Sequence, residues 1–436
     1  MLRSYHAVLA AVCLGLASSA MAIDKLVIVS PHRKSIQDEF IPKFKTFYAD
    51  TYKTSVDVDW LDNGGTTDAV RLLRTRFDKS KTTSGIDVIW GGGTSIFIDL
   101  EQEHLLQSFQ LPAALASQVP EQLSGVRLYN ASKTWVATAL SSFGIFYNKK
   151  VLGFEALKAP ATWSDLAQPG FKNQLSLADP RHSGTAMTMV QIVLNARGWD
   201  KGWELLTQIA GNTRSFTHSS SDPIKAVIAG DAAAAMAIDF YAQPKIDELG
   251  KDNLGFVLPA NETVIDPDPV AIIRGAPNRA VAQRFVAFVL SVEAQKLLIL
   301  PKGAPGGPKL ASLGRMAVNK QAYLDTEGKR SSAFDPFKQS AFLHMDVAAN
   351  AKMVHVLSDL IGALQIDTHN ELKAAWAAII KRGLNPAEVA EFARPPVSEK
   401  EVLALCDQWH DNTLRNNKVN AWVAFAKAKY LRLAAH

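Results

Sequence analysis

Short apolar segments alternate with helical patterns from residue 26 to about residue 300, and this alternation is the strongest constraint on the fold. Several of the apolar segments are continuous runs, which is typical of strands covered on both faces. The pattern predicts an α/β fold with a mostly parallel sheet. Expected strands are 26–29, 56–60, 86–90, 135–140, 144–147, 175–178, 236–240, 255–258 and 270–274, and expected helices are 37–48, 67–77, 96–100 and onward, 184–196, 222–229 and 279–298.

Four of the expected strands end in polar or glycine-rich turns that precede a helix. In open α/β sheets, ligands bind beyond the carboxyl ends of the strands. Free N–H groups at a helix start favour anions, and each turn contains a Ser or Thr that can cap the next helix. The sequence therefore predicts a site for a small polar solute at these turns. They are Ser30-Pro31-His32-Arg33, Asn63-Gly64-Gly65-Thr66-Thr67, Gly91-Gly92-Gly93-Thr94-Ser95 and Asp179-Pro180-Arg181-His182-Ser183-Gly184-Thr185.

The N-terminal residues 1–22 have the pattern of a secretory signal. Arg3 precedes an apolar stretch at 7–16, and Ala20-Met21-Ala22 forms an A-x-A-type cleavage site. We expect the mature chain to begin near Ile23 and to be free in the periplasm. Val12 disfavours lipid modification of Cys13, and Cys406 then has no disulfide partner in the mature chain.

Composition and missing motifs narrow the class of function. The net charge is +5 and the basic residues are dispersed, which argues against a nucleic-acid surface. The chain lacks C-x-x-C, H-E-x-x-H, phosphate-loop and G-x-S-x-G motifs, which favours a binding protein that needs no cofactor over an enzyme. A secreted α/β enzyme stays an alternative, because a fold does not fix a function. Its candidate groups are Ser183 beside His182 and Asp239 beside Tyr241.

In the order and spacing of its motifs, the chain resembles the periplasmic substrate-binding proteins of ABC importers. Within them it is similar to the group that contains ferric-ion binders and sugar-phosphate or organophosphate binders. The resemblance covers about residues 25–325. It is carried by residues 26–29 with their polar turn, Gly64-Gly65-Thr66-Thr67-Asp68, Ile86-Asp87-Val88-Ile89-Trp90, residues 142–148, residues 160–166, Asp179-Pro180 with Ser183-Gly184-Thr185, and Gly275-Ala276-Pro277-Asn278 with the helix that follows.

The resemblance implies a type II-like periplasmic binding protein fold. Two α/β lobes would be joined by two hinge-crossing strands, near 140–147 and 255–259, and would close on a ligand between them. The implied domains are a signal peptide at 1–22, a first lobe at 23–145 and 259–335, and a second lobe at 146–258. Residues 336–436 have a helical pattern and form a C-terminal extension outside the resemblance. The implied partner is an inner-membrane ABC permease, and the protein is expected to be a monomer.

The preferred ligand is a small anionic solute, either phosphorylated or an organic acid. Arg181 would hold its anionic group with a bidentate contact, as guanidinium groups do. Asp239 and Tyr241 would bind hydroxyl groups of its organic part. The expected ligand-binding residues are His32, Arg33, Gly65, Thr66, Gly93, Thr94, Arg181, Ser183, Gly184, Thr185, Asp239 and Tyr241.

Ferric iron is the alternative ligand that the resemblance implies. The iron-binding members use two adjacent tyrosines, and here that position falls at Phe240-Tyr241. One phenolate is therefore missing. A metal site of His32, Asp239 and Tyr241 stays open at this point, with Fe³⁺ as the ligand and not as a cofactor.

Overall fold

A computed structural model describes residues 23–61, 65–123, 125–338 and 342–435. The expected secretory signal lies outside the described residues, as do Asn63 and Gly64 of the second turn. The strands are β1 Asp24–Val29, β2 Val56–Leu61, β3 Val88–Trp90, β4 Leu106–Gln107, β5 Gln122–Leu123, β6 Val126–Arg127, β7 Trp135–Asn148, β8 Leu175–Ala178, β9 Thr213–Thr217, β10 Ala234–Ile238, β11 Leu254–Val257, β12 Ile265–Ile273 and β13 Met316–Ala317.

Helices separate most of these strands and also form the whole C-terminal part. The α-helices are α1 Lys34–Tyr52, α2 Thr66–Lys79, α3 Thr94–Gln102, α4 Ala113–Ala116, α5 Lys149–Phe154, α6 Gly184–Arg197, α7 Trp199–Asn212, α8 Asp222–Ala229, α9 Asp239–Leu249, α10 Arg279–Val289, α11 Val292–Ile299, α12 Lys320–Asp325, α13 Val347–Ile361, α14 His369–Lys381, α15 Pro386–Ala393, α16 Glu399–Cys406 and α17 Asn412–Ala435. A π-helical turn, Gly362–Ile366, follows α13.

Most of the described strands belong to one sheet of eleven strands, with the order β2-β1-β3-β12-β7-β10-β8-β9 along its main path. β1 pairs in parallel with β2 and β3, and β8 pairs in parallel with β9 and β10. The central strands β7 and β12 run antiparallel to their neighbours. The expectation of a mostly parallel sheet was therefore wrong, because the strands that connect the two ends of the sheet add antiparallel pairs.

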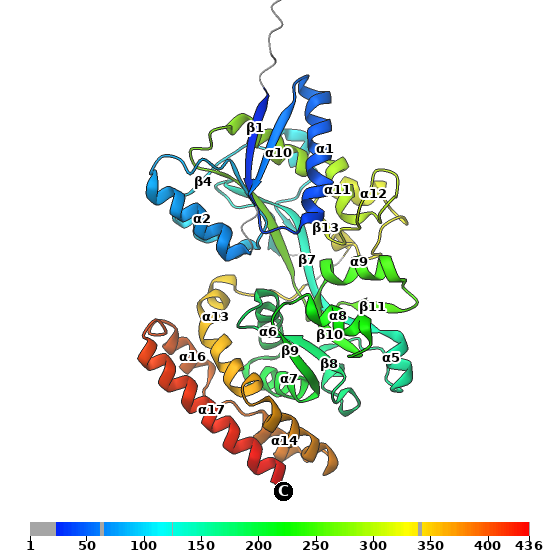
Figure 1. The fold of residues 1–436 in the computed structure, drawn as a ribbon, viewed down its shortest axis with the longest axis vertical. Coiled ribbons are helices and arrows are strands. Elements are labelled where there is room, and N and C mark those ends of the chain that lie inside the picture. Colours follow the sequence, from blue (N-terminus) through cyan, green and yellow to red (C-terminus); the bar gives the residue numbers. More distant parts are fainter. Residues whose placement is uncertain (1–22, 62–64, 124, 339–341, 436) are drawn as a thin grey trace, which may run out of the picture.

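The long strand β7 connects two groups of strands. Residues 135–142 pair with β12, whereas residues 143–148 pair with β10 and β11. Figure 1 shows β7 running from an upper lobe that contains β1 and α1 to a lower lobe that contains β8 and β9. The two strands expected at 135–140 and 144–147 are thus one strand, most of which is buried between the helices of both lobes. The residue boundaries of the lobes stay a prediction.

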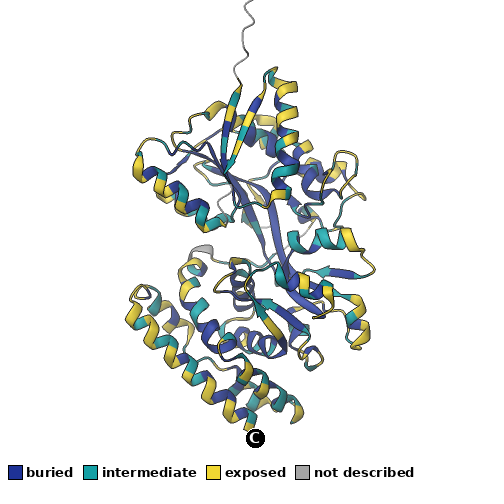
Figure 2. Cartoon of the chain, viewed as in Figure 1, coloured by how far each residue is buried: buried dark blue, intermediate teal, exposed yellow. Residues whose placement is uncertain are grey.

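Each lobe has its own apolar core. In the upper lobe, one core lies between the sheet and α1, α10 and α11, and a second lies under α2 and α3. In Figure 2 the central strand β7 is almost entirely buried, while β1, β2 and the outer faces of the helices have exposed residues. Among the helices that the structure describes, none combines the length and the apolar character needed to cross a membrane.

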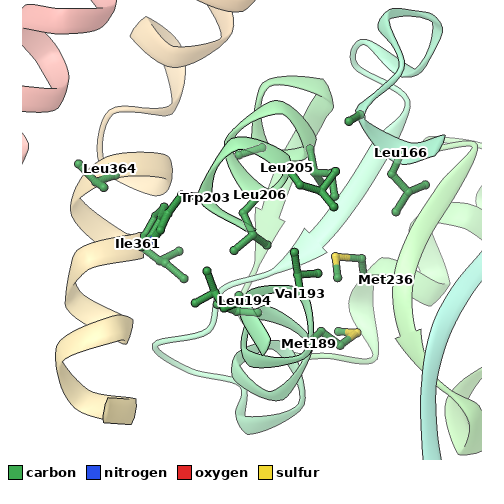
Figure 3. Close-up of a cluster of buried hydrophobic side chains, with 14 of the residues drawn as sticks. Leu166, Met189, Val193, Leu194, Trp203, Leu205, Leu206, Met236, Ile361 and Leu364 are labelled. Carbon is green, nitrogen blue, oxygen red and sulfur yellow. The ribbon is translucent and has the colours of Figure 1, made fainter. Parts of the chain in front are cut away.

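The helices after residue 346 pack on the lower lobe. α13 contacts α6, and α14 and α15 contact α7. Figure 3 shows Ile361 beside Trp203 and Leu194 of the lower lobe, and these three residues and Leu364 belong to one continuous core. The helical C-terminal part is therefore built into the core of this lobe.

Candidate ligand site

The turns that follow β1, β2 and β3 meet around the glycine loop at residues 91–93. All three glycines have positive φ angles of 81–112°, a region that side chains with a Cβ rarely adopt. They also have close neighbours: an added Cβ at positions 91, 92 and 93 would lie 2.4 Å from His32, 2.9 Å from Thr66 and 3.3 Å from Asp266. Three successive glycines thus allow the strand-end turns to approach one another.

A carboxylate that the sequence did not single out, Asp268 of β12, lies at the centre of this cluster. His32 Nε2 is 2.7 Å from its Oδ2, and Arg315 Nη1 binds the same oxygen. The backbone N–H groups of Gly92 and Gly93 donate to its Oδ1 at 2.9 and 3.4 Å. Two of the expected ligand contacts, from His32 and Gly93, therefore go to a carboxylate of the protein itself.

The electrostatics of the cluster follow from its burial. Burial alone would raise the pKa of Asp268, but Arg315 and His32 outweigh it and hold that pKa well below its usual range. Burial lowers the pKa of His32 despite the neighbouring carboxylate. A neutral His32 then donates from Nε2, and its buried Nδ1 has no hydrogen-bond partner in the described chain.

Two further carboxyls near the cluster, Asp239 and Asp266, are in no salt bridge among the described residues. The Asp239 Oδ2 accepts hydrogen bonds from the Ser142 backbone N–H and hydroxyl, both at 3.0 Å. Thr94 Oγ1 lies 3.3 Å from Asp266 Oδ1. Burial raises the pKa of Asp239 to about 7, and burial together with the nearby Asp268 raises the pKa of Asp266 to about 7.

These raised pKa values make the free energy of unfolding depend on pH in a specific way. A carboxyl with a folded-state pKa near 7 and an unfolded-state value near 3.9 stabilises the fold fully below about pH 4 and loses this contribution as the pH rises toward 7. We expect the free energy of unfolding to fall across this window. Asp266→Asn should be more stable than the parent by about 1 kcal/mol or more at pH 8, since each tenfold change in proton affinity corresponds to about 1.4 kcal/mol.

Urea unfolding followed by circular dichroism at pH 5, 6, 7 and 8 measures this effect. The control is Asp57→Asn, whose side chain is 69% exposed and which should leave the slope of stability against pH unchanged. Equal slopes for the parent and for Asp266→Asn would contradict the assignment.

Arg33 is a predicted ligand-binding residue whose guanidinium has no carboxylate partner among the described residues. Its Nη2 donates to the Phe240 carbonyl at 2.6 Å, and its guanidinium lies 5.3 Å from the Phe240 ring centroid and 4.6 Å from that of Tyr241. Arg315 approaches the same Phe240 ring, at 4.3 Å. No acidic side chain of the described chain pairs with Arg33. Its remaining N–H groups are therefore open to an external acceptor.

The three helices that follow the turns after β1, β2 and β3 each have an N-terminus without a side-chain cap from a described residue. The N-cap residues of α1, α2 and α3 are Arg33, Gly65 and Gly93, and none of these helices has a side-chain cap hydrogen bond from a described residue. The expectation that a Ser or Thr of each turn caps the next helix was therefore wrong for these three helices. Open helix starts present N–H donors and a positive dipole end to an anion.

Arg181 is already paired within the chain. Its Nη2 lies 2.7 Å from Asp179 Oδ2 and its Nη1 lies 2.8 Å from Asp367 Oδ1. The hydrogen bonds that this guanidinium donates to Asp179 and Asp367 raise its pKa above the ordinary value. A contact between Arg181 and a ligand would have to break one of these pairs, so the geometry does not favour Arg181 as the principal anion contact.

The other predicted residues of the lower lobe lie at two helix starts. Ser183 caps α6 through the Ala186 N–H at 3.1 Å, as the sequence predicted. Gly184, with no atom within 4 Å of an added Cβ, is exposed, and Thr185 is half-buried beside it. Asp239 and Tyr241 lie in the first turn of α9 and not at the end of a strand, because β10 begins and ends two residues earlier than expected.

The turn that follows β9 was not predicted from the sequence as part of the site. It contains His218 and Ser219-Ser220-Ser221, and it leads into α8. Because β9 and β10 are both parallel to β8, this turn lies at the same sheet edge as the turns around Arg181 and Tyr241. The exposed His218 ring lies 4.3 Å from the ring of His182, which belongs to the turn after β8. The run of serines before a helical pattern was the available signal.

His32, Asp239 and Tyr241 each contact another group of the described chain. The His32 ring and the Asp239 carboxylate bind Asp268 and Ser142 respectively, and the Tyr241 ring lies beneath the Arg33 cation. Within the described ranges, no group of three or more His, Cys, Asp or Glu side chains is placed to hold a metal ion. The iron site that includes Tyr241 stays a prediction.

Two α/β lobes that share a long central strand, with the strand-end turns of each lobe at its edge, define the architecture of a two-lobed binding protein. Residues 86–321, more than half of the chain, match the family model for bacterial extracellular solute-binding proteins. The chain therefore belongs to this family, as its motifs predicted.

Individual relatives agree with this assignment. The chain is similar to the phosphoglycerate transport regulatory protein of Salmonella typhimurium, with 30% identity over 201 residues that cover 45% of this chain and 47% of that protein. The match thus spans about half the length of this relative. The putative 2-aminoethylphosphonate-binding periplasmic protein of Salmonella paratyphi A is 26% identical over 258 residues, which cover 57% of this chain and 69% of that protein.

A likeness to a solved structure supports the fold. The periplasmic binding protein P5PA has a TM-score of 0.58 and 22% identity, and the alignment covers 78% of this chain and 98% of that one. The predicted type II-like fold class is confirmed by this likeness, whereas the individual site residues stay predictions.

Proposed function

We propose that this protein is the solute-binding component of an ABC importer and that it captures a small phosphorylated or organic-acid anion between its lobes. Family membership supports the general role. The observation that supports an anionic ligand is the environment of Arg33. Its guanidinium stacks on two aromatic rings beside open helix starts and pairs with no acid of the described chain. Such a group gains a charge-assisted hydrogen bond when a phosphate or carboxylate arrives.

The relatives support the same ligand class. One is named for phosphoglycerate transport and another for 2-aminoethylphosphonate binding. Both names denote small anions that carry phosphorus and an organic part. In our proposal, the helix starts at Arg33, Gly65 and Gly184 contact the anionic group, while Thr185 and Tyr241 contact the organic part.

The remaining elements of the proposed role follow the sequence predictions. Residues 1–22 direct export to the periplasm, residues 23–145 with 259–335 form the first lobe, and residues 146–258 form the second. The protein delivers its ligand, chemically unchanged, to an inner-membrane permease. It acts as a monomer.

The function is tested by identifying the ligand and then removing Arg33. Native mass spectrometry of freshly purified protein shows any co-purified solute. Calorimetric titration with 3-phosphoglycerate, 2-aminoethylphosphonate and ferric citrate then compares the candidate ligand classes. We expect one of the phosphorus-containing anions, or a close analogue found by mass spectrometry, to bind at one site per chain. Tight binding of ferric ion alone would overturn the proposal.

Arg33→Ala is expected to weaken anion binding by at least tenfold. A hydrogen bond between charged groups contributes about 1.5–3 kcal/mol, and 1.4 kcal/mol corresponds to a factor of ten. Arg33→Lys should recover only part of this loss, because an ammonium group cannot make a bidentate contact. The matched control is Arg127→Ala, an exposed arginine on β6. Unchanged affinity in Arg33→Ala would mean that the anion binds elsewhere.

A further inference from the structure

A pocket lies on the side of β7 away from the strand-end turns. It has a volume of about 750 Å³, which is within the range of small-molecule sites. α9 and β11 form one wall, and residues 298–299, 314–316 and 330–334 form the other. In Figure 1, α9, β11 and α12 lie to one side of β7, whereas α2 and α6 lie to the other. None of the turns after β1, β2, β3, β8 and β9 lines this pocket.

The charged side chains that line the pocket are mostly cationic. Arg315 and Arg330 line it with side chains that are only 8% and 7% exposed. The Nε atoms of both arginines, and the hydroxyl of the neighbouring Ser331, are buried without a hydrogen-bond partner in the described chain. Lys251, on the loop before β11, adds a further positive charge to the lining. Unpaired buried donors of this kind are costly in a folded protein.

Arg330 carries the argument because its partners leave its charge only partly compensated. Its Nη1 donates to the Tyr323 carbonyl at 2.9 Å, and its Nη2 is 3.8 Å from Asp335 Oδ2, which is beyond hydrogen-bond distance. Of the acids in the described chain, Asp239 alone lines the pocket, and its carboxylate is bound by Ser142. The lining thus offers more positive than negative charge.

Apolar side chains form another part of the lining. Phe256, Leu258, Phe334 and Phe342 contribute aromatic and aliphatic surface next to the arginines. A site with an apolar wall and a few convergent polar groups is the usual form of a small-molecule site. The combination selects a ligand with two parts, an anionic head for the guanidinium groups and an apolar body for the wall.

We infer that this pocket is a second ligand site that binds a small organic anion with an apolar body. The anionic head, a carboxylate, phosphate or sulfonate, binds at Arg330 and Arg315, and the apolar body lies against Phe256 and Phe334. The inference does not depend on the identity of the solute bound at the strand-end turns, since none of those turns lines this pocket, although Arg315 and Asp239 belong to both regions.

The probe for this site is 8-anilinonaphthalene-1-sulfonate, an amphipathic anion whose fluorescence rises in an apolar environment. We expect saturable binding of one probe per folded chain. The neutral analogue N-phenyl-1-naphthylamine should bind at least tenfold more weakly, because it cannot pair with a guanidinium group. The absence of saturable binding, or equal binding of the neutral analogue, would overturn the inference.

Two variants locate the probe within the pocket. Arg330→Gln removes the central charge and should weaken probe binding at least tenfold. Lys251→Glu changes an exposed side chain and should therefore leave the fold intact. It should weaken probe binding several-fold, because it reverses one charge of the lining. Arg315 is unsuitable because it also pairs with Asp268. Circular dichroism and thermal unfolding verify that each variant is folded.

Two control variants complete the test. Lys158→Glu, an exposed lysine outside the pocket, should leave probe affinity unchanged, which separates local from overall charge. Arg33→Ala should also leave it unchanged, because Arg33 does not line the pocket. Probe binding that is lost in Arg33→Ala, or that survives both Arg330→Gln and Lys251→Glu, would place the probe elsewhere and overturn the inference.

Discussion

Asp268→Ala is expected to lower the free energy of unfolding by about 3–5 kcal/mol at pH 7. The carboxylate is 5% exposed and is bound by Arg315, His32 and the glycine loop. Removing one partner of a buried ion pair leaves an uncompensated charge, and such changes destabilise proteins by about this amount. Arg315 would be the group left without its partner. Urea unfolding followed by circular dichroism measures the loss.

A double variant separates the lost charge pair from the lost packing. Asp268→Ala with Arg315→Met should regain a large part of the stability, because it replaces both buried charges with apolar groups. Asp57→Ala, which removes an exposed carboxylate, should change stability by less than about 0.5 kcal/mol. A loss below about 1 kcal/mol in Asp268→Ala would show that the carboxylate does not hold this cluster together.

The pH dependence of the Asp268 contribution runs opposite to that of Asp266. Its folded-state pKa is lowered, so its contribution is present above the unfolded-state value near 3.9 and is lost as the pH falls below it. The parent should therefore lose more stability than Asp268→Ala on acidification below about pH 4. This window does not overlap the range between pH 4 and 7 in which Asp266 and Asp239 act.

Much of the fold could be predicted because buried strands leave continuous apolar runs. The expected strands at 26–29, 56–60 and 175–178 match β1, β2 and β8 closely. β9 was missed because Thr213–Thr217 is an edge strand with exposed Arg214 and Ser215, so it has no apolar run. The four buried alanines at 232–235 hid the start of β10, because alanine does not indicate a strand.

Helix breaks were harder to predict than helices. The single helix expected at 279–298 is two helices, α10 and α11, because the Ser291 hydroxyl caps the second one through the Ala294 N–H. A serine inside an apolar helical pattern is compatible with either arrangement. Only its backbone conformation, which depends on the surrounding packing, decides between them.

The convergence of the strand-end turns could be predicted, but the partners of their residues could not. The turns after β1 to β3 meet as expected, since parallel strands share one sheet edge. The partner Asp268 comes from β12, about 240 residues after His32, and Arg315 comes from an irregular segment. The run Asp266-Pro267-Asp268-Pro269 within an apolar strand was a usable signal for the acids. No local pattern marks Arg315.

The role of the C-terminal helices also depends on contacts that are distant in sequence. Asp367 follows the π-helical turn and binds Arg181, which lies in the turn after β8. Gly362 of the π-helical turn allows Arg181 to approach closely. π-helical turns often occur at functional sites. The extension thus contacts the strand-end turns of the lower lobe directly. Its helical pattern was visible in the sequence, but this contact was not.

Trp376→Ala is expected to lower the free energy of unfolding by about 3–5 kcal/mol, as for other large aromatic residues truncated in a core. Trp376 lies on α14 and is 1% exposed. Its ring stacks on Phe392 with a centroid distance of 5.3 Å and packs against Gly211 of α7. Its Nε1 donates to Asn212 Oδ1 at 2.7 Å, so the variant also leaves a buried amide oxygen without this donor.

The size of this loss decides whether the extension is part of the lower lobe or an attachment to it. If α14 and α7 share one core, Trp376→Ala shifts the whole unfolding transition, because a small cooperative lobe unfolds as one unit. If the extension unfolds separately, tryptophan fluorescence should show an early transition while far-ultraviolet circular dichroism keeps most of its signal. The control is Phe154→Ala, an aromatic residue that is 89% exposed and whose loss should change stability by less than about 0.5 kcal/mol. We expect a single shifted transition, because Trp376, Phe392 and Trp203 belong to the same continuous core.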